Sequence, residues 1–458
     1  MESKFKIKKD NIIAFLMWFL ISIIVLINNE IFENSSEIIV MTFLLFEILI
    51  SFFPKEIRRA LPMIIIQITG FIRYVMIPIA IKNEIRGYSN RVIEIMILEL
   101  AAIYFGIAIY FLKNNKKKIS EKMLNINESV NQKIGLSSII TILLGGTFVL
   151  MNKAYIERYL SFSTNKTVIN DVSGGINLLV AVFFLIVFIK GIEFIYKLPL
   201  KNEIIKVVLS IIISAFYING SSITSFNVSR WSMIITSIIA FTYIARLYPN
   251  YKMKLNIFLV GCIVFAVSVG SLIKFANYNN GYNNLQNVFK EQLKYKTLNA
   301  YFAGNKNMEI ALDLNDDINV LNMSKIQIII SDLFANFPIL NKYLSDPQIQ
   351  TTVMYNYKYY NSTIACDQII PYSTQLYIFL KYFFVIFESI QIYYAFKLYY
   401  KMKEEDDFLK IYNLIYLIIS FSLVNCISLS VILQNIWIHV LPVFVIYSLN
   451  IQIKNKKI

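Results

Sequence analysis

Two arginines lie in apolar surroundings where a positive charge has a specific use. Arg73 lies within the apolar stretch 60–81, and Arg230 lies in Asn227-Val-Ser-Arg-Trp231, at the start of another apolar stretch. A guanidinium binds phosphate through two parallel N–H donors, which an ammonium group does not do. Both residues therefore point to a phosphate-bearing ligand, of which a lipid pyrophosphate is one example. Arginine beside tryptophan is also an ordinary feature of membrane-helix ends, so both interpretations of Arg230 stay open.

Arg73 has a candidate partner in Glu99. Arg73 lies eight residues before the end of the stretch 60–81, and Glu99 lies eight residues after the start of the next stretch, 91–112. At 1.5 Å per residue both lie roughly 12 Å from the same membrane interface, which favours contact. The pair is either a structural ion pair that closes a helix bundle or a carboxylate that holds the arginine until an anion arrives. Depth alone does not distinguish the two.

Other ionisable residues in apolar stretches give weaker signals. Glu47, Glu193 and Glu388 are each expected to pair with a neighbouring lysine. His439, the single histidine of the chain, is expected to be a hydrogen-bonded packing residue rather than a base. One histidine, three cysteines without metal-binding spacing and no clustered carboxylate pair predict no metal site, and no cofactor is expected.

Membrane-spanning helices must position these residues. Of the 458 residues, 57% are hydrophobic and 16% are charged. Soluble domains carry about 25% charged residues, so a soluble enzyme and a secreted disulfide scaffold are excluded. The recurring apolar runs predict an all-α polytopic membrane protein with twelve spanning helices. The expected spans are 11–28, 38–53, 60–81, 91–112, 136–153, 176–197, 203–218, 231–247, 254–275, 375–400, 410–428 and 430–450.

The distribution of basic residues predicts the orientation of these spans. Segments on the same side as the N-terminus carry 27 of the 44 lysines and arginines, whereas the short loops on the other side carry seven. This asymmetry predicts that both termini are cytoplasmic. The net charge of +15 is therefore mostly a topology signal, with contact to anionic lipids in addition. No basic stretch forms a separate module, so no nucleic-acid partner is expected.

One connection is much longer than the rest. Residues 276–372 form a large extracytoplasmic loop within a single integral membrane domain, 1–458. Apolar residues at helical spacing in Ile326–Ala335 predict an amphipathic helix that lies on the outer leaflet. Four tyrosines near the end of the loop are candidates for stacking on sugar rings, and their partly period-two spacing also suits a strand: Tyr355, Tyr357, Tyr359 and Tyr360. A structured loop of this length is typical of a functional segment.

Several segments resemble a known family. Tyr301-Phe-Ala-Gly-Asn-Lys-Asn-Met-Glu-Ile-Ala-Leu-Asp313 and Asp367-Gln-Ile-Ile-Pro-Tyr-Ser-Thr-Gln-Leu-Tyr377 resemble loop motifs of bacterial oligosaccharide repeat-unit polymerases of the Wzy type. Phe71-Ile-Arg-Tyr-Val-Met-Ile-Pro78 and Ser229-Arg-Trp231 are similar to the arginine-bearing segments of that family. One departure is the absence of a glycine soon after Gln375, where Leu380-Lys381-Tyr382 stands instead.

The resemblance implies a GT-C-like glycosyltransferase in the bacterial cytoplasmic membrane, which polymerises oligosaccharide repeat units carried on undecaprenyl pyrophosphate. Arg73 and Arg230 would stabilise the leaving pyrophosphate, because fixed cations favour developing negative charge. Asp367 or Glu99 would act as base for the acceptor hydroxyl. The motifs further imply substrate contacts by Tyr301, Asn305, Asp313, Gln375 and Tyr377. Membrane lipids, a chain-length regulator and a flippase of the same pathway are the expected partners.

Other functions remain open at this point. A lipid-linked oligosaccharide flippase would handle the same pyrophosphate lipids, but the long external loop and the absence of an internal repeat argue against one. A secondary transporter often breaks its helices at Gly or Pro, and this chain has 14 Gly and 9 Pro. A glycan ligase would share the topology and the arginines. The product, whether capsule, O-antigen or exopolysaccharide, and its sugars are not encoded in these features.

Overall fold

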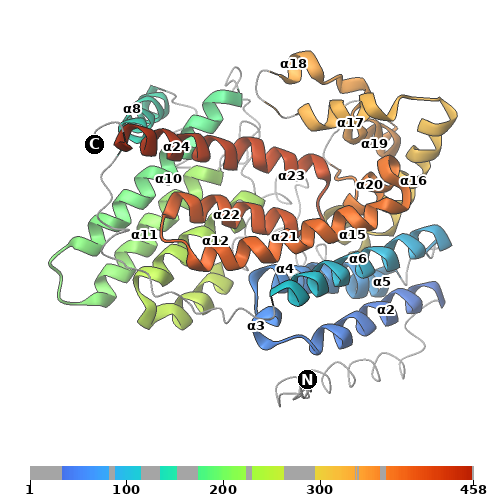
Figure 1. The fold of residues 1–458 in the computed structure, drawn as a ribbon, viewed down its shortest axis with the longest axis horizontal. Helices are drawn as coiled ribbons and strands as arrows, with labels where there is room; N and C mark the ends of the chain where they lie inside the picture. The colour runs from blue at the N-terminus through green and yellow to red at the C-terminus, as the bar shows by residue number, and fades with distance from the viewer. Residues whose placement is uncertain are drawn as a thin grey trace, which may run out of the picture. The chain divides into compact units, whose positions relative to one another are not determined.

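The chain is all-helical in the part that the structure describes. The computed structural model describes residues 34–81, 88–114, 135–151, 174–222, 230–262, 294–335, 337, 340–361 and 368–455, and within these ranges no strand occurs (Figure 1). Six of the described helices are long and apolar enough to cross a membrane, which is consistent with an all-α membrane protein. They are Leu61–Ala80, Asn90–Asn114, Leu179–Lys197, Glu203–Ser221, Tyr372–Glu404 and Leu429–Ile451.

Shorter helices occupy other expected spans. They are α2 (Asn34–Ser51), α8 (Leu136–Met151), α12 (Arg230–Leu247) and α22 (Phe408–Ser422). The expected span 11–28 and most of 254–275 lie outside the described residues. Twelve spans therefore stay a prediction.

Two compact units make up the chain. The first consists of Met1–Ser120, Glu291–Lys401 and Leu417–Gln434. At its beginning, α4 (Leu61–Phe71), the π-helical turn η2 (Ile72–Met76) and α5 (Ile77–Ile81) follow one another without a break. The helix α6 (Asn90–Asn114) and α2 pack together. This unit contains most of the residues singled out in the sequence.

The long loop folds into helices with a hydrophobic core of their own. These helices are α15 (Tyr295–Tyr301), α16 (Asn305–Val320), α17 (Lys325–Phe334), α18 (Asn341–Leu344) and α19 (Thr351–Tyr360). Their shared core contains Ala311, Leu314, Ile318, Ile328, Tyr355, Ile370 and Ile378. The predicted helix at Ile326–Ala335 is confirmed as α17. The strand interpretation of Tyr355–Tyr360 is wrong, because these tyrosines lie on α19.

The loop helices dock on α5, η2 and α6. Both guanidinium nitrogens of Arg91, at the start of α6, donate to the two carboxylate oxygens of Asp316 on α16, at 2.7 and 3.1 Å. This hydrogen bonding lowers the pKa of the Asp316 carboxyl. Helix α15 also packs on α5 and η2. The loop therefore covers the end of the helix that carries Arg73.

A strained turn follows the loop helices. Helix α20 (Tyr372–Leu380) is joined through η5 (Lys381–Phe383) to α21 (Phe384–Glu404). Lys381 has φ 51°, ψ −138°, a conformation that favours glycine. This is the stretch where the family resemblance implies a glycine. Here the lysine adopts the turn, and its Nζ donates to Asn315 Oδ1 at 2.7 Å.

Close approach of α6 and α21 depends on Gly106. A Cβ at this position would lie 2.6 Å from Ser389 O and 2.7 Å from Ile392 Cβ. Because backbone cannot move as a flexible side chain does, we expect Gly106→Ala to destabilise the protein by about 2 kcal/mol or more. The measurement is the thermal unfolding of the purified protein in detergent. Gly261→Ala is the matched control, since nothing lies within 4 Å of its Cβ position, and equal effects of the two substitutions would contradict this account.

The second unit comprises Glu121–Lys290, Met402–Tyr416 and Asn435–Ile458. Its helices α8, α10 (Gly174–Lys197), α11 (Glu203–Ser222) and α12 pack in chain order through neighbouring pairs, α10 on α8 and α11 on both α10 and α12. Glu193 pairs with Lys190 at 2.7 Å, which confirms the expected lysine partner. His439 stacks on Tyr416 with ring centroids 4.6 Å apart, and its Nδ1 is buried without a hydrogen-bond partner among the described residues. The ring packs against an aromatic neighbour, as expected, but the expected hydrogen bond is not found at Nδ1 among the described residues.

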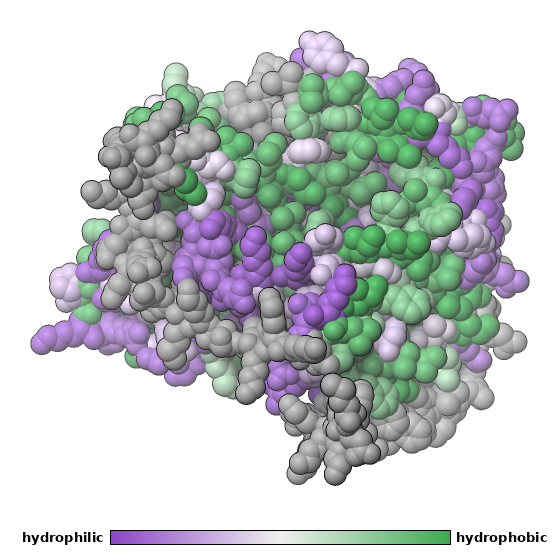
Figure 2. Space-filling model, in the orientation of Figure 1, coloured by the Kyte–Doolittle hydropathy of each residue, from purple (hydrophilic) through white to green (hydrophobic). Residues whose placement is uncertain are grey.

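Large apolar side chains remain exposed along the helices that are candidate spans. Examples from different helices are Leu112 (74% exposed), Leu143 (61%), Phe194 (66%) and Phe216 (58%). Figure 2 shows broad hydrophobic areas on the visible face. Exposed apolar surface of this extent is costly in water and suits helices whose outer faces contact lipid tails.

Candidate functional site

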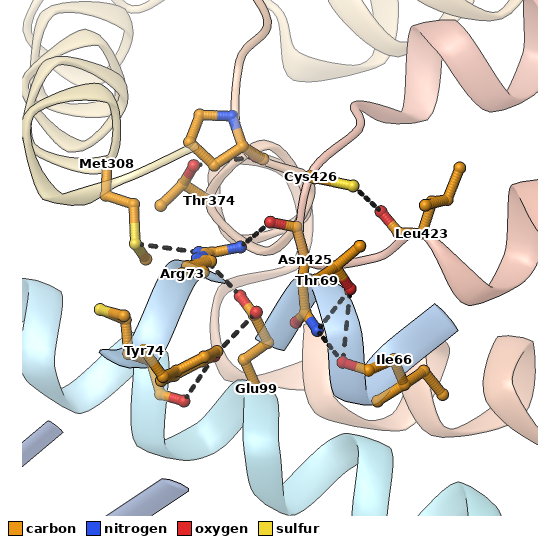
Figure 3. Close-up of polar contacts among 12 residues, drawn as sticks. Ile66, Thr69, Arg73, Tyr74, Glu99, Met308, Thr374, Leu423, Asn425 and Cys426 are labelled. Carbon is orange, nitrogen blue, oxygen red and sulfur yellow. Dashed lines mark hydrogen bonds and ion pairs between the residues drawn. The ribbon is translucent and has the colours of Figure 1, made fainter. Parts of the chain in front are cut away.

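The centre of the first unit is a buried ion pair. Arg73 lies on η2, the π-helical turn between α4 and α5, and Glu99 lies on α6. Arg73 Nη2 is 3.0 Å from Glu99 Oε2, and neither side chain is exposed (Figure 3). The contact that equal depth predicts is therefore present. Single π-helical turns often mark functional positions, because the widened turn disrupts regular side-chain spacing.

Two further segments meet Arg73. Its Nη1 donates to the backbone oxygen of Asn425 at 2.7 Å. Its Nη2 also contacts the sulfur of Met308, on the loop helix α16, at 3.1 Å (Figure 3). Its Nε has no hydrogen-bond partner in the described part of the chain. The guanidinium is thus bound strongly by Glu99 and by the backbone of Asn425, whereas its contact with the Met308 sulfur is a weak hydrogen bond.

Glu99 is positioned by a tyrosine as well as by Arg73. The hydroxyl of Tyr74 donates to Glu99 Oε1 at 2.8 Å and lies 3.2 Å from the backbone oxygen of Met96. The ring of Tyr74 stacks on Phe43 of α2, with centroids 5.6 Å apart. These contacts position the carboxylate beside Arg73.

A second carboxyl group lies near this pair. Glu388 on α21 is fully buried and interacts electrostatically with both Arg73 and Glu99. Neither of its oxygens has a hydrogen-bond partner among the described residues. The expectation that it pairs with a neighbouring lysine is wrong, because no lysine lies within hydrogen-bond distance of either oxygen in the described part of the chain. Glu47 also lacks the expected lysine and accepts a hydrogen bond from Gln67 at 2.7 Å.

A separate polar network surrounds Gln375 on α20. Its Nε2 donates to Thr351 Oγ1 at 2.7 Å and to Asp332 Oδ2 at 3.1 Å, and its Oε1 accepts from the backbone N–H of Leu429 at 2.8 Å. Asp332 also accepts hydrogen bonds from the backbone and hydroxyl of Thr351. Burial raises the pKa of the Asp332 carboxyl to about 6, although the donors from Thr351 and Gln375 oppose this. The network fastens loop helices α17 and α19 to α20 and α23 (Leu429–Asn435).

The remaining sequence candidates lie around these two clusters. Asn305, at the start of α16, is buried and accepts a hydrogen bond from Tyr295 at 2.6 Å. Asp313 is exposed on the same helix, and Tyr301 is half-buried at the end of α15. Tyr377 is buried under the ammonium group of Lys381, 4.9 Å from its ring centroid. The substrate role of these four residues stays a prediction.

Two candidates cannot be placed. Arg230 begins α12, as the apolar pattern predicts, but its side chain lies outside the described residues. Asp367 also lies outside them. That Arg73 and Arg230 bind the same ligand is therefore still a hypothesis.

Four side chains of these clusters were missed in the sequence. Tyr74, Met308 and Asn425 carry no charge, so neither charge nor depth indicated them. Asp332 did leave a signal, as a carboxylate inside the otherwise apolar run Ile326–Ala335. Such a residue on a helix that packs against a core needs buried partners.

Neither a metal-binding cluster nor a known relative identifies the function of this site. Within the described ranges no three His, Cys, Asp or Glu side chains converge on one point. No protein family matches the chain, and neither a curated protein nor a solved structure is significantly similar to it. The physical chemistry of the site is consequently the basis for a functional proposal.

Proposed function

We propose that this chain polymerises oligosaccharide repeat units carried on a lipid pyrophosphate, by glycosyl transfer at the outer face of the bacterial cytoplasmic membrane. In this proposal the chain crosses the membrane twelve times with both termini in the cytoplasm. The loop 276–372 then lies outside, where it contacts the sugars. The product is a surface polysaccharide.

The state of Arg73 carries the proposal. A buried guanidinium normally uses its N–H donors fully, yet Nε has no partner in the described part and Nη2 faces a thioether as well as Glu99. Sulfur of methionine is a weak acceptor. Phosphate oxygens would replace it with strong, paired hydrogen bonds. The side chain that would be displaced, Met308, belongs to the loop segment that resembles the polymerase family. Binding of the phosphate at Arg73 would therefore also release a contact between Arg73 and the loop.

The chemistry follows from this arrangement. The acceptor hydroxyl attacks the anomeric carbon of the donor sugar while the lipid pyrophosphate leaves. Negative charge then grows on the pyrophosphate, and a cation fixed beforehand stabilises that charge without reorganising. Arg73 supplies one such cation, and Arg230 is proposed as the second. The loop helices orient the two sugar chains, which lowers the entropic part of the barrier.

Polymer synthesis in isolated membranes tests the proposal. Membranes of a strain that lacks this gene contain the lipid-linked repeat units that the strain assembles. We expect addition of the purified full chain to convert them into a ladder of longer products and to release the lipid pyrophosphate. Repeat units that stay unchanged in the presence of the folded protein would contradict the proposal.

Replacing Arg230 with lysine tests the guanidinium role at the second arginine. Lysine keeps the charge but loses the two parallel donors, so we expect polymer synthesis to fall by about tenfold or more at unchanged protein abundance. The control is Arg246→Lys, at the other end of α12, where Arg246 donates to the backbone oxygens of Met402 and Glu405. Full activity of Arg230→Lys would show that Arg230 does not bind the pyrophosphate through two parallel hydrogen bonds.

A further inference from the structure

Glu388 is a buried carboxyl group that takes no part in the Arg73–Glu99 ion pair. It is fully buried on α21, and both of its carboxylate oxygens lack a hydrogen-bond partner among the described residues. Ionising a carboxylate in such a place costs far more than a single unmade hydrogen bond, unless a cation balances the charge. The nearby cation, Arg73, is already in contact with Glu99 at 3.0 Å. A proton on Glu388 resolves this imbalance.

Helix packing places Glu388 at the level of the ion pair. Its neighbour Ser389 donates a hydrogen bond to the backbone oxygen of Ala102 at 2.9 Å. Ala102 follows Glu99 on α6 by less than one turn. The ionisable groups that interact electrostatically with Glu388 are Arg73, Tyr74 and Glu99, together with Tyr372 on α20. Arg73 is the one cation among them, and two carboxyl groups share it.

We propose that Glu388 holds a proton at rest and shuttles it during glycosyl transfer; this inference rests on the polymerase function proposed above. When the bond between the anomeric carbon and the pyrophosphate oxygen breaks, the electron pair leaves with that oxygen. Glu388 donates its proton to the pyrophosphate. The acceptor hydroxyl oxygen bonds to the anomeric carbon, and its proton passes to the Glu388 carboxylate. The enzyme thus ends each transfer in the protonation state in which it began.

Glu388 suits this role better than Glu99. The carboxylate of Glu99 is bound by Arg73 and, at 2.8 Å, by the hydroxyl of Tyr74. Moving a proton on or off Glu99 would therefore break an ion pair and a hydrogen bond. In the described part of the chain Glu388 makes no such bonds, so its proton is free to move, and the charge left behind interacts with Arg73. The same arginine then stabilises both the pyrophosphate and the transient carboxylate.

Glu388→Gln in the membrane assay tests the shuttle. Glutamine has the shape of the carboxyl group and is neutral like its protonated form, so protein abundance, thermal unfolding and retention of the lipid-linked repeat unit should be unchanged. Polymer synthesis should fall by about 100-fold or more, because the proton can no longer be transferred. Glu388→Asp keeps a carboxyl group and should recover part of the rate. Glu47→Gln, a buried carboxyl of the same unit that accepts from Gln67, should stay active.

Two results would overturn the shuttle. One is Glu388→Gln protein with more than a tenth of the wild-type rate. The other is a marked loss of folded Glu388→Gln protein, which would show that the residue is charged and stabilises the fold as an ion. Inactive wild-type protein in the same assay would instead reject the polymerase function itself. Active wild-type protein together with an active Glu388→Gln variant would reject the shuttle alone.

Discussion

Arg73→Met is expected to deplete the folded protein from the membrane and to abolish polymer synthesis. The substitution leaves Glu99 fully buried without its cation, and removing one partner of a buried ion pair costs about 3 to 5 kcal/mol. The contact of Nη1 with the Asn425 backbone is lost as well. A loss of this size is comparable with the whole stability of many folded domains. The measurement is membrane abundance by immunoblot together with thermal unfolding in detergent.

A double variant separates stability from function at this site. Arg73→Met combined with Glu99→Gln removes both charges, so we expect abundance to return close to the wild-type level, since paired removal is often near neutral. Polymer synthesis should still be absent, because no cation remains for the pyrophosphate. If Arg73 and Glu99 are only a structural pair, the double variant should instead regain activity. Glu99→Gln alone would then lower abundance more than activity per molecule.

Asp332→Ala is expected to loosen the loop helices α17 and α19 from α20 and α23. Asp332 is the acceptor for the backbone and hydroxyl of Thr351 and for the side chain of Gln375. Each buried donor left without an acceptor costs about 1 to 3 kcal/mol, so the variant should lose about 3 kcal/mol or more. Amide hydrogen exchange should increase in α17 and α19 before it increases in α6.

The matched control for this variant is Asp346→Ala. Asp346 accepts a hydrogen bond from the backbone of Gln348 in the same loop, but its side chain lies at an exposed position. Loss of such an exposed cap costs about 1 kcal/mol. Similar unfolding temperatures for the two variants would mean that the network around Gln375 does not hold the loop.

Much of the fold could be predicted from apolar runs, because a helix that faces lipid must be apolar over its whole length. The positions of α6, α10 and α11 agree closely with the expected spans. The Arg73–Glu99 contact was also predictable. The two residues lie eight positions from adjoining ends of two consecutive antiparallel helices, so they are at the same height along the pair. The helix α17 followed from its spacing of apolar residues.

Features that depend on packing between distant segments were not predictable. Glu388 interacts electrostatically with the ion pair because α21 lies close to α6, and that close approach depends on the missing side chain at Gly106. The tyrosines of α19 have spacings that fit a strand. In the structure Tyr355 and Tyr359 lie one helical turn apart, with ring centroids separated by 6.2 Å. The strained turn at Lys381 was not predictable either, because a lysine stands where a glycine would normally indicate such a turn.

The glycan profile of a strain that lacks this gene, compared with its parent on a gel, is the most direct test of the polymerase proposal. We expect the ladder of long chains to be replaced by a single repeat unit at the cell surface, and to return when the wild-type gene is restored. If no repeat unit reached the surface and lipid-linked units accumulated inside the cell, the protein would be a flippase, and the polymerase proposal would be wrong.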